Sequence, residues 1–361
     1  MPDQHRRRRE ALARRIADGT EAADAVLITR VVNVRYLTGL DSSNAALLVH
    51  ADGEAVLCTD SRYAGTARRV CPDLELVVAR PTAETLTARA GKAGVRRLAF
   101  EAHDVTVDRH GTLTAIDGAP EFVAAGRPVE ELRLVKDEEE LALLREACAI
   151  SDRAFAAFLP SLAPGMTERE AAIALERHMV DLGAERPAFH TIVASGPNGA
   201  LPHHRPGDRV LARGDLVTFD FGALYGGYHA DMTRTVALGE PADWQREIYD
   251  LVLSAQLAGI AAAEPGADTR RVDRAARTVI ADAGHGDHFP HGLGHGVGLE
   301  IHEAPLMGYD KTGKLMDRVP ITAEPGVYLA GRGGVRIEDT LVVRGSGPEL
   351  LTETTKDLLV L

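Results

Sequence analysis

An internal repeat runs through the second part of this 361-residue chain, with an offset of 101 positions between its two copies. Thr167 and Glu170 form a capping-box pattern where the first copy's helix would begin. The offset pairs the following residues: Pro164-Gly165 with Pro265-Gly266, Arg169 with Arg270, Ala174 with Ala275, Asp181 with Asp282, Gly183 with Gly284, and His190 with His291. The sequence therefore predicts two α+β halves around a pseudo-twofold axis, with a sheltered cleft between them. Chance similarity between two helices rich in Ala and Arg is the alternative.

Two aspartates flank a predicted hairpin turn in the first half. Runs typical of β-strands lie on both sides of Tyr225-Gly226-Gly227 in the segment LVTFDFGALYGGYHADMTRTV, residues 216–236. A turn centred between Tyr225 and Gly226 would place Asp220 directly opposite Asp231 on one face of the hairpin. Two like charges so close repel each other, so we expect a cation, and the spacing suits a divalent metal.

The second half offers a matching pair of glutamates. The turn-rich stretch 330–334 contains Gly331. Glu324 in TAEPGVY and Glu338 in GVRIEDT lie equally far from Gly331 along the sequence. Each half thus supplies one hairpin with two facing carboxylates. A solvated surface charge explains any one carboxylate, but four in matching hairpins among apolar strands favour a site.

Histidines are concentrated in the segment HGLGHGVGLEIH, which contains His291, His295 and His302. The glycines of this segment allow the backbone to approach a site closely. In the first half, His203 follows the turn-forming stretch SGPNGALP, and we expect the neighbouring His204 to be exposed. Four carboxylates and one imidazole suit two divalent metal ions, with Mn²⁺ favoured and Co²⁺ or Zn²⁺ as substitutes. Two such ions can hold a bridging hydroxide and polarise a carbonyl, which is the chemistry of hydrolysis.

Composition excludes several functional classes. The net charge is −12, so we expect no nucleic-acid partner, and the arginines at 6–9 are interpreted as a solvated helix end. No apolar run of about eighteen residues occurs, so we expect no membrane span. No signal peptide is evident, and the three cysteines are scattered: Cys58, Cys71 and Cys148. This pattern predicts reduced thiols in a cytoplasmic protein.

The first third of the chain reads as alternating strands and helices. Two apolar runs, 45–50 and 54–58, are joined through Asp52-Gly53, a hairpin signal. A charged segment, 130–140, separates this part from a second part that opens with apolar residues at helical spacing from Leu141 onward. We therefore expect an α/β N-terminal domain over residues 1–132. An α+β catalytic domain with the internal repeat would follow over residues 133–361.

The motifs FDFG…HADMTRT, HGLGHGVGLEIHE, AEPGVY and GVRIEDT together resemble those of the pita-bread metallopeptidases. This family includes methionine aminopeptidase, aminopeptidase P, prolidase and creatinase. NVRYLTGLDSSNAALLV and LCTDSRY resemble the creatinase-like N-terminal domain of aminopeptidase P and prolidase, which methionine aminopeptidase lacks. The resemblance implies a pita-bread catalytic domain and an Xaa-Pro aminopeptidase acting on proline-containing peptides. It also implies a homodimer, in which one subunit's N-terminal domain walls the neighbour's cleft.

The resemblance also implies which residues bind the metals. Asp220 would bind one ion, whereas His295 and Glu324 would bind the other. Asp231 and Glu338 would bridge the two ions.

Further residues match positions that act on the substrate. Glu324 also matches the general base for the bridging water, and His203 and His302 match histidines that orient substrate and stabilise the tetrahedral intermediate. His291 matches a histidine that lines the pocket near the proline. Arg336 resembles an arginine that holds a metal ligand in place, although an edge-strand surface arginine is the alternative.

Several other functions stay open at this point. Creatinase works without metal and has altered ligand positions, and non-enzymatic relatives typically lose ligands, whereas all five are present here. The ligand set does not exclude an amidohydrolase that acts on a non-peptide small molecule. Prolidases, which cleave Xaa-Pro dipeptides, often carry an arginine soon after the HE motif. Position 306 here is Leu, which favours longer peptides, although Arg332 or Arg336 could serve instead.

Overall fold

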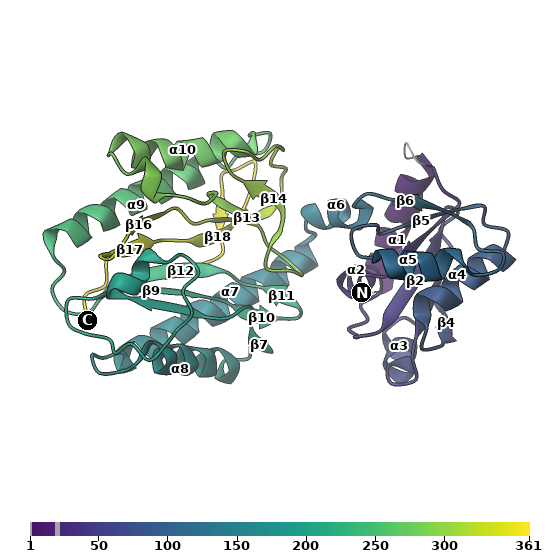
Figure 1. The fold of residues 1–361 in the computed structure, drawn as a ribbon, viewed down its shortest axis with the longest axis horizontal. Coiled ribbons are helices and arrows are strands. Elements are labelled where there is room, and N and C mark those ends of the chain that lie inside the picture. Colours follow the sequence, from purple (N-terminus) through teal and green to yellow (C-terminus); the bar gives the residue numbers. More distant parts are fainter. Residues whose placement is uncertain (1, 19–21) are drawn as a thin grey trace. The chain divides into compact units, whose positions relative to one another are not determined.

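The computed structural model describes residues 2–18 and 22–361, which form two compact units, Met1–Arg133 and Leu134–Leu361 (Figure 1). Each unit has its own core and is described separately. Among the described residues, every helix is too short or too polar to cross a membrane.

The first unit is built on one six-stranded sheet with the order β4-β3-β2-β1-β5-β6. Its strands are β1 (Ala25–Ile28), β2 (Ala45–His50), β3 (Ala55–Thr59), β4 (Glu75–Val78), β5 (Arg97–Phe100) and β6 (Glu121–Ala124). Its helices are α1 (Pro2–Asp18), α2 (Val31–Thr38), α3 (Ala64–Val70), α4 (Thr82–Lys92), α5 (Val107–Thr114) and α6 (Pro128–Leu134). The predicted α/β domain is confirmed, as is the hairpin between β2 and β3, whose turn contains Gly53 at φ +95°.

The arginine run near the N-terminus is not simply a solvated helix end. Arg8 and Arg9 are buried on α1, where their guanidinium groups donate to the carbonyls of Tyr36 at 3.0 Å and Leu37 at 2.9 Å. These carbonyls belong to the last turn of α2, whose backbone acceptors have no partner within their own helix. The expectation of a fully solvated run is therefore wrong, because two of its side chains hold α1 against α2.

The second unit contains the predicted repeat. Helices α8 (Glu168–Asp181) and α10 (Thr269–Asp282) begin and end 101 residues apart. The capping box of Thr167 and Glu170 forms at the start of α8. Three strands of the first half have the order β12-β9-β8, and their counterparts in the second half have the order β18-β15-β13. All these neighbouring strands are antiparallel, so the repeat extends from the helices to the sheets.

The remaining elements of this unit surround these sheets. Its other helices are α7 (Glu138–Phe158), α9 (Asp243–Ala261), η1 (Leu159–Ser161), η2 (Gly196–Ala200) and η3 (Gly286–His288). Its strands are β7 (Arg186–Pro187), β8 (Ile192–Ser195), β9 (Leu216–Phe221), β10 (Ala223–Tyr225), β11 (Tyr228–His229), β12 (Met232–Ala237), β13 (Gly294–Gly296), β14 (Glu303–Met307), β15 (Pro320–Ala323), β16 (Gly326–Leu329), β17 (Gly333–Arg336), β18 (Asp339–Val342) and β19 (Glu349–Leu350).

Helices cover both outer faces of the strands in this unit. Figure 1 shows α9 and α10 on one side and α7 and α8 on the other. On the α7 side, Phe155 stacks on Phe221 with ring centroids 5.1 Å apart, and Phe158 meets Phe219 edge-on. The predicted long helix is confirmed, and it begins at Glu138 because Asp137 caps it. The strands between the helices are therefore buried and hold their side chains in fixed positions.

The first hairpin has a different register from the predicted one. Tyr225 pairs with Tyr228, so the turn consists of Gly226 and Gly227, at φ +57° and +82°. Two successive positive φ values are typical of a type I′ turn, which suits the twist of a hairpin. Asp220 consequently lies opposite Thr233 and not opposite Asp231. The prediction was wrong by two positions, a shift that keeps both aspartates on the same face.

The second hairpin has the predicted register. Gly326 pairs with Arg336 and Ala323 pairs with Asp339, so Glu324 and Glu338 face each other between these two pairs. The turn contains Gly331 at φ +74°, a conformation that glycine adopts without strain.

Hydrogen bonds join the two hairpins to each other. The amide of Glu338 donates to the carbonyl of Thr233 at 3.1 Å, and the hydroxyl of Thr340 donates to the carbonyl of Asp231 at 2.7 Å. Arg234 donates to the carbonyl of Glu338 as well. The two halves are therefore connected at the bases of the strands that carry the carboxylates.

Candidate metal centre

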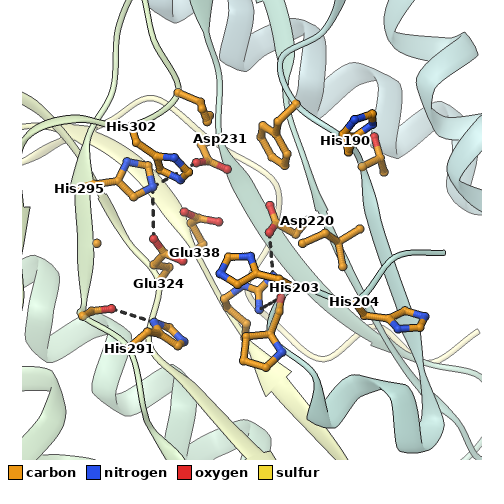
Figure 2. A pocket seen from close by; sticks show the side chains of 18 of the residues that line it. His190, His203, His204, Asp220, Asp231, His291, His295, His302, Glu324 and Glu338 are labelled. Carbon is orange, nitrogen blue, oxygen red and sulfur yellow. Dashed lines mark hydrogen bonds and ion pairs between the residues drawn. The ribbon is translucent and has the colours of Figure 1, made fainter. Parts of the chain in front are cut away.

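A cavity of about 500 Å³ lies in the second unit, between the two halves of the repeat (Figure 2). All of the residues proposed from the sequence to act in the site line this cavity: His203, Asp220, Asp231, His291, His295, His302, Glu324, Arg336 and Glu338. The structure thus brings together residues that are up to 135 positions apart in the sequence.

The four carboxylates occupy corresponding places in the two halves. Asp220 is the penultimate residue of β9, and Glu324 directly follows β15, the equivalent strand. Asp231 directly precedes β12, and Glu338 directly precedes β18. The repeat therefore explains why two carboxylates from each half meet at one point.

The ring of His295 shows that this point requires a cation. Its Nδ1 lies 2.9 Å from the carbonyl of Gly296, which can only accept, so Nδ1 carries the hydrogen. Burial lowers the pKa of His295 to about 4, so the ring is neutral near pH 7 and Nε2 is an acceptor. Yet Nε2 lies 3.5 Å from Oδ2 of Asp231 and 3.4 Å from Oε1 of Glu324. Three acceptors facing one another need a metal ion or a proton between them.

Two of the carboxylates each have one oxygen held by the protein and one left free. Oδ2 of Asp220 accepts from Arg336 at 2.7 Å, and Oε2 of Glu338 accepts from Thr233 at 2.7 Å. Among the described residues, neither Oδ1 of Asp220 nor Oε1 of Glu338 has a hydrogen-bond partner, although both atoms are buried. Buried oxygens without partners are rare, and metal coordination would satisfy both.

The carboxylates have strongly shifted acidity. Burial raises the pKa of Asp231 and of Glu338 well above the ordinary values, and repulsion from neighbouring carboxylates adds to the effect. Burial also raises the pKa of Glu324 to about 8, although Arg336 opposes the shift. Without a metal, the site would therefore take up protons. A divalent cation reverses this preference because it stabilises the ionised carboxylates.

The glycines of the histidine-rich segment allow its backbone to pack closely against the neighbouring strands. A Cβ atom on Gly294 would lie 2.3 Å from the carbonyl oxygen of Thr322, and one on Gly296 would lie 2.2 Å from that of Ala304. The close approach expected here is thus to adjacent backbone. It sets His295 on a short strand between β14 and β15.

Tyr328 belongs to the site, although the sequence motifs assigned it no role. Its hydroxyl lies 2.8 Å from Nε2 of His291 and accepts from Arg336 at 3.0 Å. Nδ1 of His291 lies 2.8 Å from the carbonyl of Gly292, so Nε2 accepts from the Tyr328 hydroxyl. Burial raises the pKa of Tyr328 to about 12. Gly326 pairs with Arg336, and Tyr328 lies two residues further along β16 on the same face. This spacing was the signal that could have placed Tyr328 beside Arg336.

The other histidines of the cavity differ in their surroundings. The exposed ring of His302 meets that of His295 edge-on, with centroids 4.4 Å apart. Figure 2 shows the His203 ring turned toward the carboxylates and the His204 ring turned away from them. His204 was expected to be exposed, but its side chain is only 14% exposed and lies 2.7 Å from Oε2 of Glu168.

The cationic side chains also differ from expectation. Arg332 lies over the ring of Trp244 at 4.3 Å and is not among the residues that line the cavity. Arg336 is engaged with Asp220. Two other cations, Arg205 and Lys311, line the cavity instead.

A second group of possible ligands lies in the first unit: Glu101, His103 and Glu130. Here Oε1 of Glu130 accepts from Arg30 at 2.9 Å and from Asn33 at 3.0 Å. A guanidinium therefore already supplies the positive charge that a metal would bring. The centre in the second unit is the better candidate, because among the described residues the buried Oε1 of Glu338 has no hydrogen-bond partner.

Comparisons with known proteins show which families and structures this chain is similar to. Residues 142–345 match metallopeptidase family M24, and residues 8–135 match the creatinase/prolidase N-terminal domain. The chain is 38% identical over 350 residues to an Xaa-Pro dipeptidase of Pyrococcus furiosus, covering 93% of this chain and 95% of the relative. Among solved structures, an Xaa-Pro dipeptidase from Bacillus anthracis has a TM-score of 0.93 at 36% identity, with full coverage of both chains. An X-Pro aminopeptidase from Thermotoga maritima has a TM-score of 0.88 at 36% identity, covering 94% of this chain and 98% of that one.

Proposed function

This chain belongs to metallopeptidase family M24, and from that membership we propose that it hydrolyses Xaa-Pro bonds at the amino terminus of peptides. The observation that carries the proposal is the contact of the neutral His295 ring with Asp231 and Glu324. None of these three groups has a hydrogen to donate to the other two, so a proton or a metal ion must lie between them. The names of the related dipeptidases and aminopeptidase support the Xaa-Pro bond as the one cleaved.

Five residues would hold two divalent ions: Asp220, Asp231, His295, Glu324 and Glu338. The set is rich in carboxylate oxygen and contains no thiolate, which favours Mn²⁺, with Co²⁺ or Zn²⁺ as substitutes. When bound, such ions activate a water and polarise the scissile carbonyl.

The chain's own side chains would position the substrate and move its protons. Glu324 would accept a proton from the attacking water, since its carboxylate lines the cavity beside the other ligands. His203 and His302 line the same cavity and would donate to the oxyanion that develops on the substrate. His291 would contact the proline while Tyr328 fixes its ring.

The length of the peptide is the finer part of the proposal. Leu306 lines the cavity where a prolidase-type arginine is expected, which favours an aminopeptidase that accepts longer peptides. A dipeptidase is the second candidate, and Lys311 favours it. Lys311 lines the cavity, and its ammonium could pair with a dipeptide's free carboxylate, although it now contacts Asp310 at 2.9 Å.

A peptide panel tests the proposal. Protein reconstituted with Mn²⁺ would be assayed on Ala-Pro, Ala-Pro-amide and Ala-Pro-Ala, after its metal content has been measured. An aminopeptidase should cleave all three, whereas a dipeptidase should prefer Ala-Pro and lose that preference in Lys311→Met. Absence of Xaa-Pro cleavage by fully loaded protein, or full activity after complete metal removal, would overturn the proposed function.

A homodimer stays our prediction for the assembly. It rests on the family resemblance, which implies that the N-terminal domain of one subunit walls the cleft of the other. Light scattering at the assay concentration checks this expectation, and an active monomer would contradict it.

A further inference from the structure

Glu168 is a fully buried carboxylate outside the metal centre, at the first position of α8. Its Oε1 accepts from the amide of Ser195 at 2.9 Å, from the hydroxyl of Ser195 at 2.7 Å and from Asn198 at 2.9 Å. Its Oε2 accepts from His204 at 2.7 Å and from the amide of Gly207 at 3.3 Å. One side chain thus holds both ends of the segment 195–207.

The bond between Glu168 and His204 has a defined direction. Burial raises the pKa of Glu168, but the hydrogen bonds from Ser195, Asn198 and His204 outweigh it, so the pKa is lowered overall. The carboxylate is therefore ionised and can only accept. Nε2 of His204 must carry the hydrogen, and the contact is a charge-assisted hydrogen bond from a side chain that is only 14% exposed.

His203, the neighbour of His204, has no comparable anchor of its own. No hydrogen bond joins its side chain to another described residue, and it is exposed within the cavity. The chain is held on both sides of it instead. The carbonyl of Pro202 accepts from Arg336 at 3.2 Å, and His204 donates to Glu168.

The two adjacent histidines point in opposite directions. Figure 2 shows His203 facing the carboxylates of the metal centre and His204 facing away from them. A bond that fixes the ring of His204 therefore also fixes the backbone from which the His203 ring projects. The local backbone adds one contact, from the amide of His204 to the carbonyl of Leu201 at 3.2 Å.

We propose that Glu168, acting through His204, is a positioning residue that fixes the place of the His203 ring over the metal centre. The inference rests on the proposed function, in which His203 contacts the substrate. His204 itself does not contact the substrate in this arrangement. It fixes the position of the His203 ring. A displacement of about 1 Å at such a position can lower a rate by about a hundred-fold.

The test compares His204→Ala with His204→Gln on Ala-Pro. The alanine variant should lower kcat by about ten- to a hundred-fold, with KM and metal content close to wild type. The glutamine variant keeps an N–H at the distance of Nε2 and should restore most of kcat. Amide hydrogen exchange of residues 201–207 should rise in His204→Ala and stay low in His204→Gln.

A double-mutant cycle with His203→Ala separates positioning from general destabilisation. If His204 acts through His203, then His204→Ala should cause no further loss of kcat in a His203→Ala background. His178→Ala, which removes a histidine from α8 outside the cavity, is the matched control and should keep wild-type kcat.

Three outcomes would overturn the inference. The first is a His204→Ala variant with wild-type kcat in a protein that cleaves Xaa-Pro bonds, which leaves the proposed function standing. The second is an equal loss from His204→Ala with and without His203. The third is inactivity of the fully loaded wild-type protein, which removes the proposed function and this inference together.

Discussion

Arg336 donates from Nη2 to Oδ2 of Asp220 across 2.7 Å, and both side chains are largely buried. The same guanidinium donates from Nε to Thr233 and from Nη1 to the hydroxyl of Tyr328. One planar group therefore connects a carboxylate of the first half to strands of both halves. It holds one oxygen of Asp220, whereas the other is buried and has no hydrogen-bond partner among the described residues.

The first prediction concerns Arg336→Lys. An ammonium is a single point of charge and cannot reproduce the fork that reaches Asp220, Thr233 and Tyr328 together. We expect metal affinity to fall by about ten- to a hundred-fold while the protein stays folded, because partners that orient ligands have effects of this size. Titration against a competing chelator measures the affinity. An unchanged dissociation constant would show that Asp220 does not need Arg336.

The second prediction separates metal binding from chemistry. Asp231→Ala and Glu338→Ala should lose metal together with turnover, because two cations would then share too little negative charge. His203→Ala and His302→Ala should keep their metal and lose about a hundred- to a thousand-fold in kcat, the usual value of one oxyanion donor. Elemental analysis beside steady-state kinetics checks both. Loss of metal from His302→Ala with retention by Glu338→Ala would reverse our assignments.

The third prediction concerns the stability of metal-free protein against pH. The pKa of Glu324 is raised to about 8 from an ordinary 4.5, so between these values the folded state binds a proton that the unfolded state lacks. The free energy of unfolding should therefore fall as pH rises through this window. Above about pH 6.5, histidines with lowered pKa values are mostly neutral in both states, so the carboxylates dominate there.

Thermal melting of stripped and loaded protein between about pH 6.5 and about pH 8 measures this effect. Melting temperature should fall with pH in the stripped protein, and the gain on adding Mn²⁺ should grow, because protons compete with the metal. Stripped Glu324→Gln is the control and should show a weaker slope. A stripped wild-type protein that gains stability across this range would contradict the raised carboxylate pKa values.

The fourth prediction concerns Gly222→Ala. A Cβ at this position would lie 1.8 Å from the carbonyl oxygen of Ala230, the residue before Asp231. The backbone must move, which should cost about 1–3 kcal/mol in the free energy of unfolding and should also reduce metal content. Denaturant unfolding and elemental analysis check the two effects. Gly345→Ala, where a Cβ meets open space, is the control and should change neither.

The register of the second hairpin was predictable because Gly331 marks its turn clearly. The first hairpin was not, since Tyr225-Gly226-Gly227 offers two possible turn centres and only the backbone geometry decides between them. The repeat was visible because its helices keep one offset and its glycines end them. The partner of His204 was hidden, because Glu168 lies 36 residues away and nothing local indicates the contact. Sequence patterns predicted the features that the repeat and the turn residues determine. They did not predict contacts between side chains that lie far apart in the sequence.

The hydrogen bonds that join the two hairpins have a consequence for how metal enters the protein. Thr233 and Thr340 connect the bases of the carboxylate-bearing strands through contacts of the protein itself. In small zinc domains the metal must order the chain, and its removal unfolds them. In this protein, hydrogen bonds of the surrounding fold join the strands that carry the ligands, so we expect the fold to arrange the ligand set. Metal exchange should therefore proceed in the native state, and a chelated sample should recover in ordinary buffer without passing through denaturation.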